Sequence, residues 1–277
     1  MYSPSIHLAP RPPAKAGDRL PSYAAAPLAG EPTPRGRTGP PDFVGVGTQR
    51  SGTTWWFDLL LGHPAIRAPR GRRKEQHFFD RFGAEEMRAE DVAAYHELFR
   101  RRRGQICGEW TPRYMGDVWA VRLLRRAAPE AKLLVLLRDP IERYRSGVAH
   151  RSSRDPDRRM DLIASDAVER GRYASQLRRL YELFPREQVL VLQYERCVGD
   201  PLGQYRRTLR FLGVTPDHEP ADTGELRGST TDPQKAALWP DLLAGLHAAL
   251  DPEVAALPAL APGLDLALWP NFSGLDG

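Results

Sequence analysis

The chain has 277 residues, 41% of them hydrophobic, and a formal net charge of +5. That length predicts one sizeable domain, or two small ones, and two cysteines exclude a disulfide framework. No apolar run approaches the roughly 20 residues that a membrane-spanning helix needs. Because the opening segment "MYSPSIHLAPRPPAKAGDRL" lacks the apolar core of a secretory signal, we expect a cytoplasmic protein with no membrane partner.

The positive charge comes mainly from arginine, in runs such as Arg67–Lys74 and Arg100–Arg103. This balance suits nucleic acid and a small anionic cofactor equally well, so charge alone does not choose between them. We interpret the runs as solvated surface, which disfavours a nucleic-acid partner. Cys107 and Cys197 have no metal-ligand spacing, and we expect them to be buried, reduced thiols.

Residues 1–41 are rich in proline and show no hydrophobic periodicity. They hold ten of the 26 prolines, so they cannot bury enough apolar surface to offset the entropy lost on ordering. The composition changes at residue 42, where short apolar runs begin. The sequence therefore predicts a disordered tail over 1–41 and a single domain over 42–277.

From residue 42 onward, apolar runs alternate with helical patterns. Strands are predicted at Phe43–Gly47, Lys132–Leu137 and Gln188–Tyr194. Helices are predicted at Thr53–Leu61, near Glu85–Arg102 and Asp117–Ala127, after Pro140, and near Ala167–Phe184, Leu202–Leu212 and Leu238–Leu250. Strands that are apolar throughout and separated by helices are typical of a parallel sheet covered on both faces. The predicted fold class is therefore three-layer α/β, with a central, mostly parallel sheet flanked by helices.

The stretch "FVGVGTQRSGTTWW" begins at Phe43 and connects the first strand to the first helix. Four residues separate Gly47 from Gly52, which is the spacing of a phosphate-binding loop. The helix begins at Ser51 or Gly52, so its unpaired N–H groups and the positive end of its dipole face the loop. This arrangement predicts an anion site.

The lysine of a P-loop NTPase is missing, because Thr53 follows the second glycine and the nearby cation is Arg50. Such enzymes also hold Mg²⁺ with an aspartate at the end of another strand. Here the strand Lys132–Leu137 ends in Arg138, whose guanidinium suits a second phosphate. Asp139 follows, either as a metal ligand or as the cap of the next helix. A P-loop kinase or NTPase therefore stays the alternative function.

Ser146 lies eight residues after Arg138, in "RDPIERYRSGVAH". A helix that starts near Pro140 brings Ser146 just under two turns along, so its hydroxyl can face the same anion as Arg138. Two anion sites without a metal constellation predict one ligand that carries separate phosphates and needs no Mg²⁺.

At this point the chain resembles the sulfotransferases that use 3′-phosphoadenosine 5′-phosphosulfate (PAPS) and release 3′-phosphoadenosine 5′-phosphate (PAP). "QRSGTTW" is similar to the family's 5′-phosphosulfate loop, and "RDPIERYRSGVAH" to its 3′-phosphate motif. The branch with heparan-type and many bacterial enzymes is resembled by "KEQHFFD", "GEWTPRYM", "GRYASQLRRLYELFP" and "LDLALWPNF". The resemblance covers roughly residues 42–272 and implies the P-loop NTPase-like sulfotransferase fold.

The resemblance implies roles for the residues that bind PAPS. The 5′-phosphate would be held by the N–H groups and hydroxyls of four residues: Ser51, Gly52, Thr53 and Thr54. Arg50 stands where the family has a catalytic lysine, and its guanidinium can stabilise developing charge but is a poor proton donor. Trp55 would stack on adenine, while Arg138 and Ser146 would bind the 3′-phosphate. No metal is expected.

For catalysis, the resemblance nominates Glu75 as the base that takes a proton from the acceptor, with His77 as its supporting partner or as the alternative base. It also implies four residues that bind the acceptor or support its site, namely Lys74, Glu109, Arg113 and Tyr173. The acceptor would be a hydroxyl or an amine of a small molecule or a carbohydrate. The sequence leaves a homodimer open, and it places a second 3′-phosphate contact only loosely, within residues 227–235.

Overall fold

The computed structural model describes residues 36–154, 160–220 and 238–275. Residues 35–277 cluster as one compact unit. Most of the predicted tail lies outside the described residues, but Arg37 belongs to the described part. Its backbone exchanges two hydrogen bonds of 3.0 Å with that of Arg101 in an isolated antiparallel bridge. The region without predicted structure therefore includes a residue that pairs with the domain.

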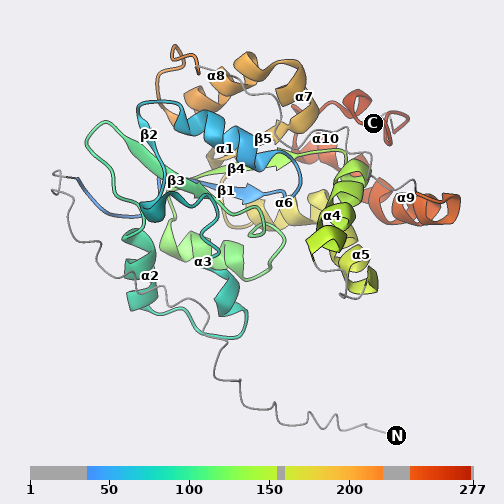
Figure 1. Cartoon of the computed structure of the whole chain (residues 1–277), viewed down its shortest axis with the longest axis horizontal. Coiled ribbons are helices and arrows are strands. Elements are labelled where there is room, and N and C mark those ends of the chain that lie inside the picture. The colour runs from blue at the N-terminus through green and yellow to red at the C-terminus, as the bar shows by residue number, and fades with distance from the viewer. Residues whose placement is uncertain (1–35, 155–159, 221–237, 276–277) are drawn as a thin grey trace, which may run out of the picture. The chain divides into compact units, whose positions relative to one another are not determined.

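Five parallel strands form the central sheet in the order β2-β3-β1-β4-β5 (Figure 1). Their bounds are β1 Phe43–Gly47, β2 Ile66–Arg67, β3 Ile106–Trp110, β4 Lys132–Leu137 and β5 Val189–Gln193. Since all five run the same way, their carboxyl ends meet at one edge of the sheet. Ligands of open α/β sheets bind at that edge.

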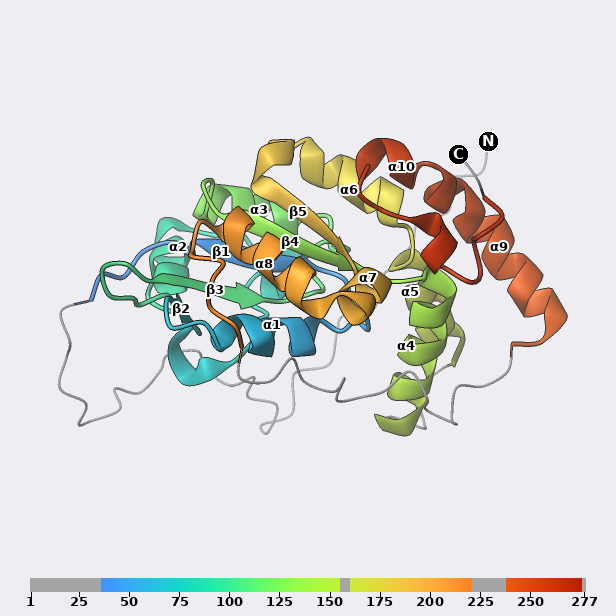
Figure 2. The ribbon, with the colours of Figure 1, turned by 90° about the horizontal axis from the view of Figure 1, so that it is seen from above.

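Helices cover both faces of the sheet, as Figure 2 shows. Their bounds are α1 Thr53–Leu61, α2 Ala89–His96, α3 Ala120–Ala127, α4 Pro140–Arg154, α5 Met160–Glu169, α6 Tyr173–Tyr181, α7 Tyr194–Gly199, α8 Pro201–Leu212, α9 Pro240–Ala255 and α10 Leu257–Leu260. Four short 3₁₀ turns complete the described chain, η1 Arg70–Arg72, η2 Asp80–Gly83, η3 Arg186–Gln188 and η4 Leu266–Leu268. The predicted three-layer α/β class is confirmed.

Alternate residues of β4 belong to two different hydrophobic cores, because successive side chains of a strand point to opposite faces. Leu133, Val135 and Leu137 join the core that includes α3 and α6. Leu134 and Leu136 join the core on the other face, with α1 and α8. A strand buried on both faces must be apolar at every position, which explains the unbroken run "LLVLL".

The predicted elements agree best where the apolar pattern is strong. The ranges Phe43–Gly47, Thr53–Leu61 and Lys132–Leu137 are observed as predicted. The helix predicted near Glu85–Arg102 is wrong in length, because α2 covers only Ala89–His96. The single helix predicted near Ala167–Phe184 is also wrong: α5 ends at Glu169 and α6 begins at Tyr173.

Strand β3 was not predicted, because glycine and glutamate interrupt its apolar pattern. It packs closely on β1, where the indole of Trp110 lies over Gly45 and donates a hydrogen bond of 3.0 Å to the carbonyl of Gly47. A Cβ atom on Gly45 would collide with that indole ring. The close packing of Trp110 on β1 therefore requires glycine at residue 45.

We expect the substitution Gly45→Ala to lower the free energy of unfolding by about 1 to 3 kcal/mol or more, because overpacking forces neighbouring groups to move. Urea denaturation measures the change. Gly39→Ala is the matched control, since a Cβ atom there meets nothing within 4 Å. An equal response of the two variants would contradict the packing that we describe.

Candidate active site

The loop between β1 and α1 is shaped as an anion site. Gly52 stands before the first helical residue in the left-handed conformation, with φ of 82°. A Cβ atom there would collide with the ring of Tyr194, so the position requires glycine on two grounds. The hydroxyls of Thr48 and Ser51 lie 2.7 Å apart beneath the loop and are buried. The first N–H groups of α1, which have no partner inside a helix, lie at this loop.

Arg50, inside the loop, contacts both Arg138 and Ser146, the two residues that the sequence predicts at a 3′-phosphate. Arg138 follows β4, is 8% exposed, and donates a hydrogen bond of 3.4 Å to the backbone carbonyl of Arg50. The Nε of Arg50 donates to the hydroxyl of Ser146 on α4 at 3.1 Å. The Arg138 guanidinium also lies 4.8 Å from the ring centre of Tyr194. Two guanidinium groups and a hydroxyl thus gather at the start of α4, which suits a phosphate.

Asp139 acts as a helix cap. It is fully buried, and its Oδ1 accepts hydrogen bonds from the N–H groups of Ile141 and Glu142 at 2.9 and 3.1 Å. Its Oδ2 accepts two more bonds, from the backbone and side-chain nitrogens of Asn271 at 3.1 and 2.9 Å. Both carboxylate oxygens are therefore engaged by the fold. Of the two roles left open for Asp139, the geometry supports the cap.

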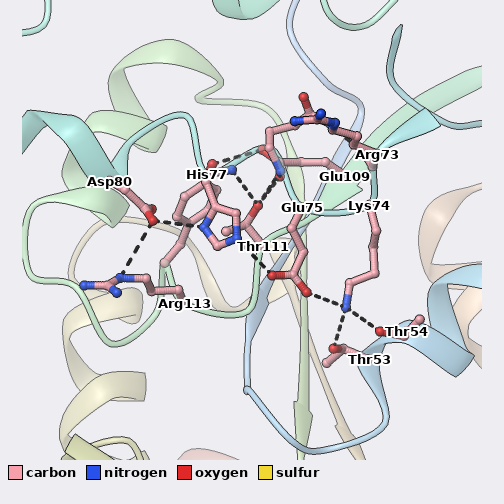
Figure 3. A network of polar contacts seen from close by, with 12 residues as sticks. Thr53, Thr54, Arg73, Lys74, Glu75, His77, Asp80, Glu109, Thr111 and Arg113 are labelled. Atoms are coloured by element: carbon pink, nitrogen blue, oxygen red, sulfur yellow. Dashed lines mark hydrogen bonds and ion pairs between the residues drawn. The ribbon is translucent and has the colours of Figure 1, made fainter. Parts of the chain in front are cut away.

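Lys74, Glu75 and His77 form a chain of polar contacts that reaches the anion loop (Figure 3). The Nζ of Lys74 donates to the hydroxyls of Thr53 and Thr54 at 2.9 and 3.0 Å. The same atom lies 3.0 Å from one oxygen of Glu75, and His77 Nε2 lies 3.1 Å from the other. Lys74 thus links Glu75, the predicted base, to the first turn of α1.

The segment that carries these residues is fixed to the carboxyl end of β3. The N–H of Trp110 donates to the carbonyl of Lys74 at 2.9 Å, and the N–H of Gln76 donates to the hydroxyl of Thr111 at 2.9 Å. His77 has a positive φ of 51°, which turns the chain. The contacts with β3 therefore hold Glu75 near the anion loop, although the two segments are about 20 residues apart in the sequence.

The pKa values of Glu75 and His77 are shifted from those of isolated side chains. A hydrogen bond with Asp80, followed by one with Glu75, raises the pKa of His77 to about 10. Burial raises the pKa of Glu75, but the hydrogen bond from His77 and the charge of Lys74 outweigh it and lower the pKa overall. At neutral pH His77 is a cation and cannot accept a proton, whereas Glu75 is ionised and can. This favours Glu75 as the base.

Asp80 controls the charge of His77 through the 2.9 Å contact with Nδ1. We expect Asp80→Asn to lower the His77 pKa, because it removes the largest cause of the upward shift. Nuclear magnetic resonance titration of the imidazole protons measures this pKa directly. Asp91→Asn, which removes a half-buried carboxylate on α2 that pairs with Arg81, is the control. An unchanged pKa in Asp80→Asn would contradict the contact.

Glu109 and Tyr173, predicted in the acceptor site, lie in the interior. Both are fully buried: Glu109 accepts hydrogen bonds from Tyr95, at 2.8 Å, and from Thr111, and Tyr173 donates to the carbonyl of Arg138 at 2.9 Å. Burial raises the pKa of Glu109 to about 7, against those hydrogen bonds. Of the two roles expected for these residues, their burial agrees with support of the site and not with direct contact to an acceptor.

Arg113 and Trp55 keep partly exposed positions. The Nε of Arg113 lies 2.7 Å from Asp117 and 3.8 Å from Asp80, next to the carboxylate that contacts His77 (Figure 3). The indole of Trp55 lies edge-on against that of Trp56, with ring centres 5.1 Å apart. Trp56 itself is buried. Trp55 is therefore the more exposed indole of this pair, and its stacking on adenine and a place for Arg113 at the acceptor side stay predictions.

Sequence reasoning missed Asp80 and Thr111, which position His77 and Gln76. Both stand inside the predicted motifs "KEQHFFD" and "GEWTPRYM", but only the folded chain shows their partners. Residues 227–235, expected to hold a second 3′-phosphate contact, lie outside the described residues. Within the described part of the chain, no group of three His, Cys, Asp or Glu side chains is arranged to hold a metal. No helix in the same part has the length and apolar content to cross a membrane.

Comparisons with known proteins agree with this site. A family model described as a sulfotransferase domain matches residues 40–227. Heparan sulfate glucosamine 3-O-sulfotransferase 6 of Homo sapiens is 33% identical over 207 residues, covering 70% of this chain and 57% of that protein. The 3B1 enzyme of Mus musculus is 32% identical over 188 residues, covering 63% of this chain and 46% of that protein. The chain spans about half the length of the curated relatives it matches.

A solved sulfotransferase structure resembles this chain over nearly its whole length. The sulfotransferase from Alicyclobacillus acidocaldarius is 28% identical and superposes with a TM-score of 0.65, covering 84% of this chain and 99% of that one. The family model spans the anion loop, the Lys74–His77 segment and the start of α4. The chain therefore belongs to the sulfotransferase domain family.

Proposed function

We propose that this protein transfers a sulfuryl group from PAPS to a hydroxyl or an amine of a carbohydrate or small-molecule acceptor. The observation that carries the proposal is the connection of a carboxylate base to an anion loop through one lysine. Glu75 is held between Lys74 and His77, and Lys74 contacts both hydroxyls in the first turn of α1. An in-line transfer needs this proximity, because the base must act next to the group that is moved.

The second anion site supports a donor with a 3′-phosphate. Arg138 follows β4 and Ser146 lies on α4, and the loop residue Arg50 contacts both, so one ligand can place separate phosphates against the two sites. The same geometry weakens the kinase or NTPase alternative, since both oxygens of Asp139 are used by helix α4 and Asn271. The relatives named above act on heparan sulfate glucosamine at the 3-O position, which favours a carbohydrate hydroxyl as the acceptor.

The test has two steps. Isothermal titration calorimetry with PAP should show binding to the full chain without added metal. Incubation with PAPS and a panel of oligosaccharides and small alcohols and amines, followed by mass spectrometry, should then show an acceptor that has gained one sulfuryl group. Absence of PAP binding, together with Mg²⁺-dependent turnover of ATP, would replace the proposal with the kinase alternative.

We expect Arg138→Ala to weaken PAP binding by about 10-fold to 150-fold, because a hydrogen bond to a charged group contributes about 1.5 to 3 kcal/mol. Calorimetry measures the change, and thermal denaturation confirms that the variant folds. Arg206→Ala is a matched control, since Arg206, on α8, forms an exposed ion pair with Glu219. Equal PAP affinities of Arg138→Ala and wild type would refute the 3′-phosphate site.

A further inference from the structure

Lys74 is directed at the anion loop. Its Nζ has three oxygen partners within 3.0 Å, one on each of Thr53, Thr54 and Glu75. An ammonium group has three donors, so these contacts use all of them. The side chain is only 13% exposed, and burial lowers the pKa of Lys74. A buried cation therefore touches the helix turn where the 5′ end of a nucleotide would bind.

Arg50 is directed elsewhere. Its Nε contacts Ser146 on α4 at 3.1 Å, and its backbone, with φ of 68°, presents a carbonyl to Arg138 at 3.4 Å. Both contacts join Arg50 to the residues predicted to bind a 3′-phosphate. Lys74 thus contacts the turn that faces the 5′ end of the proposed ligand, whereas Arg50 contacts the two residues expected at its 3′-phosphate.

We propose that Lys74 is the catalytic cation at the 5′-phosphosulfate of the donor, and that Arg50 serves its 3′-phosphate. This inference rests on the proposed function and changes two expectations from the sequence. Lys74 was expected to bind the acceptor or to support its site, and Arg50 was expected to act where the family has its catalytic lysine. Here the lysine that performs this role comes from the segment after η1 instead of the loop.

The contacts of Lys74 define what it does during transfer. Glu75 takes the proton of the acceptor hydroxyl while the acceptor oxygen bonds to sulfur. The bond between sulfur and the bridging oxygen breaks, and its electron pair remains on the 5′-phosphate of PAP. Lys74 exchanges one of its two threonine contacts for a hydrogen bond to that oxygen as the negative charge develops there, and it keeps its own proton. A preorganised donor of this kind acts where water is excluded, which strengthens its effect.

Two fragments of the donor separate the roles of the two cations without any acceptor. Adenosine 5′-phosphate carries only the 5′ group, and adenosine 3′-phosphate carries only the 3′ group. In calorimetric titrations, Lys74→Met should weaken adenosine 5′-phosphate about tenfold or more and leave adenosine 3′-phosphate within about twofold of wild type. Arg50→Met should show the reverse pattern. If PAP binds but a fragment alone is too weak, competition against PAP gives the same ratios.

Lys132→Met is the matched control, because Lys132 begins β4 at the opposite end of the sheet and contacts the carbonyl of Phe211. It should leave both affinities unchanged. Loss of adenosine 5′-phosphate binding in Arg50→Met, with none in Lys74→Met, would overturn the inference and leave the proposed function intact. Failure of wild type to bind PAP would instead overturn the proposed function. With an acceptor from the screen, Lys74→Met should lower kcat by about 10²-fold to 10³-fold.

Discussion

Replacing Glu75 with glutamine is expected to lower kcat by about 10²-fold to 10⁴-fold, because the amide keeps the shape of the side chain but cannot accept a proton. The effect is large because no neighbour can take over. His77 is protonated at neutral pH through its contact with Asp80, and Lys74 carries no acceptor. Steady-state rates with PAPS and an acceptor from the screen measure the loss.

PAP affinity separates a catalytic loss from a damaged site. Because Glu75 contacts the donor site only through Lys74, the glutamine variant should bind PAP nearly as well as wild type. Glu86→Gln changes an exposed carboxylate before α2 and serves as the control for a surface charge. Turnover of Glu75→Gln close to that of wild type would exclude Glu75 as the base. Since His77 is already protonated, the base would then lie outside the Lys74–Glu75–His77 chain.

Replacing Asp139 with alanine is expected to lower the free energy of unfolding by about 3 to 5 kcal/mol. Loss of a helix cap contributes about 1 kcal/mol of this. The remainder comes from Asn271, whose two partly buried nitrogens would lose their acceptor, each at a cost of about 1 to 2 kcal/mol, the lower part of the range for a buried group. Chemical denaturation of the two proteins measures the difference.

Asp200→Ala is the matched control for Asp139→Ala. Asp200 caps α8 through one exposed bond of 2.9 Å to the N–H of Gly203. Its removal should cost only about 1 kcal/mol, so the excess in Asp139→Ala isolates the contribution of Asn271. Similar losses in the two variants would show that the contact with Asn271 adds no stability.

The donor side of the site follows closely from the sequence. An anion loop between an apolar strand and a helix has a local cause, since glycine, backbone N–H groups and the helix dipole all lie within ten residues. Arg138 and Ser146 follow a strand that was predicted at both ends. Their contacts with Arg50 require only that β4 pairs with β1, and such pairing is expected of apolar strands in a parallel sheet.

The acceptor side could not be predicted in the same way. Glu109 and Tyr173 were assigned from their motifs, but a motif does not show which face of an element a side chain occupies. Strand β3 escaped the pattern because Gly108 and Glu109 interrupt it, yet its pairing with Phe43–Gly45 fixes Glu109 in the core. The orientation of the Lys74 side chain likewise depends on the hydrogen bond from the N–H of Trp110 to the carbonyl of Lys74. This bond joins segments that lie far apart in the chain.

The contact between Asp139 and Asn271 has a consequence for synthesis. The two residues are separated by 132 positions, so Oδ2 of Asp139 lacks these two partners until Asn271 has been made. Chains are synthesised at about 5 to 20 residues per second, and amino-terminal parts can fold while the ribosome is still working. The anion loop can form early in this process, but Asp139 must wait for Asn271 to leave the exit tunnel. The contacts that hold Asp139 at the start of α4 are therefore complete only after Asn271 has been translated.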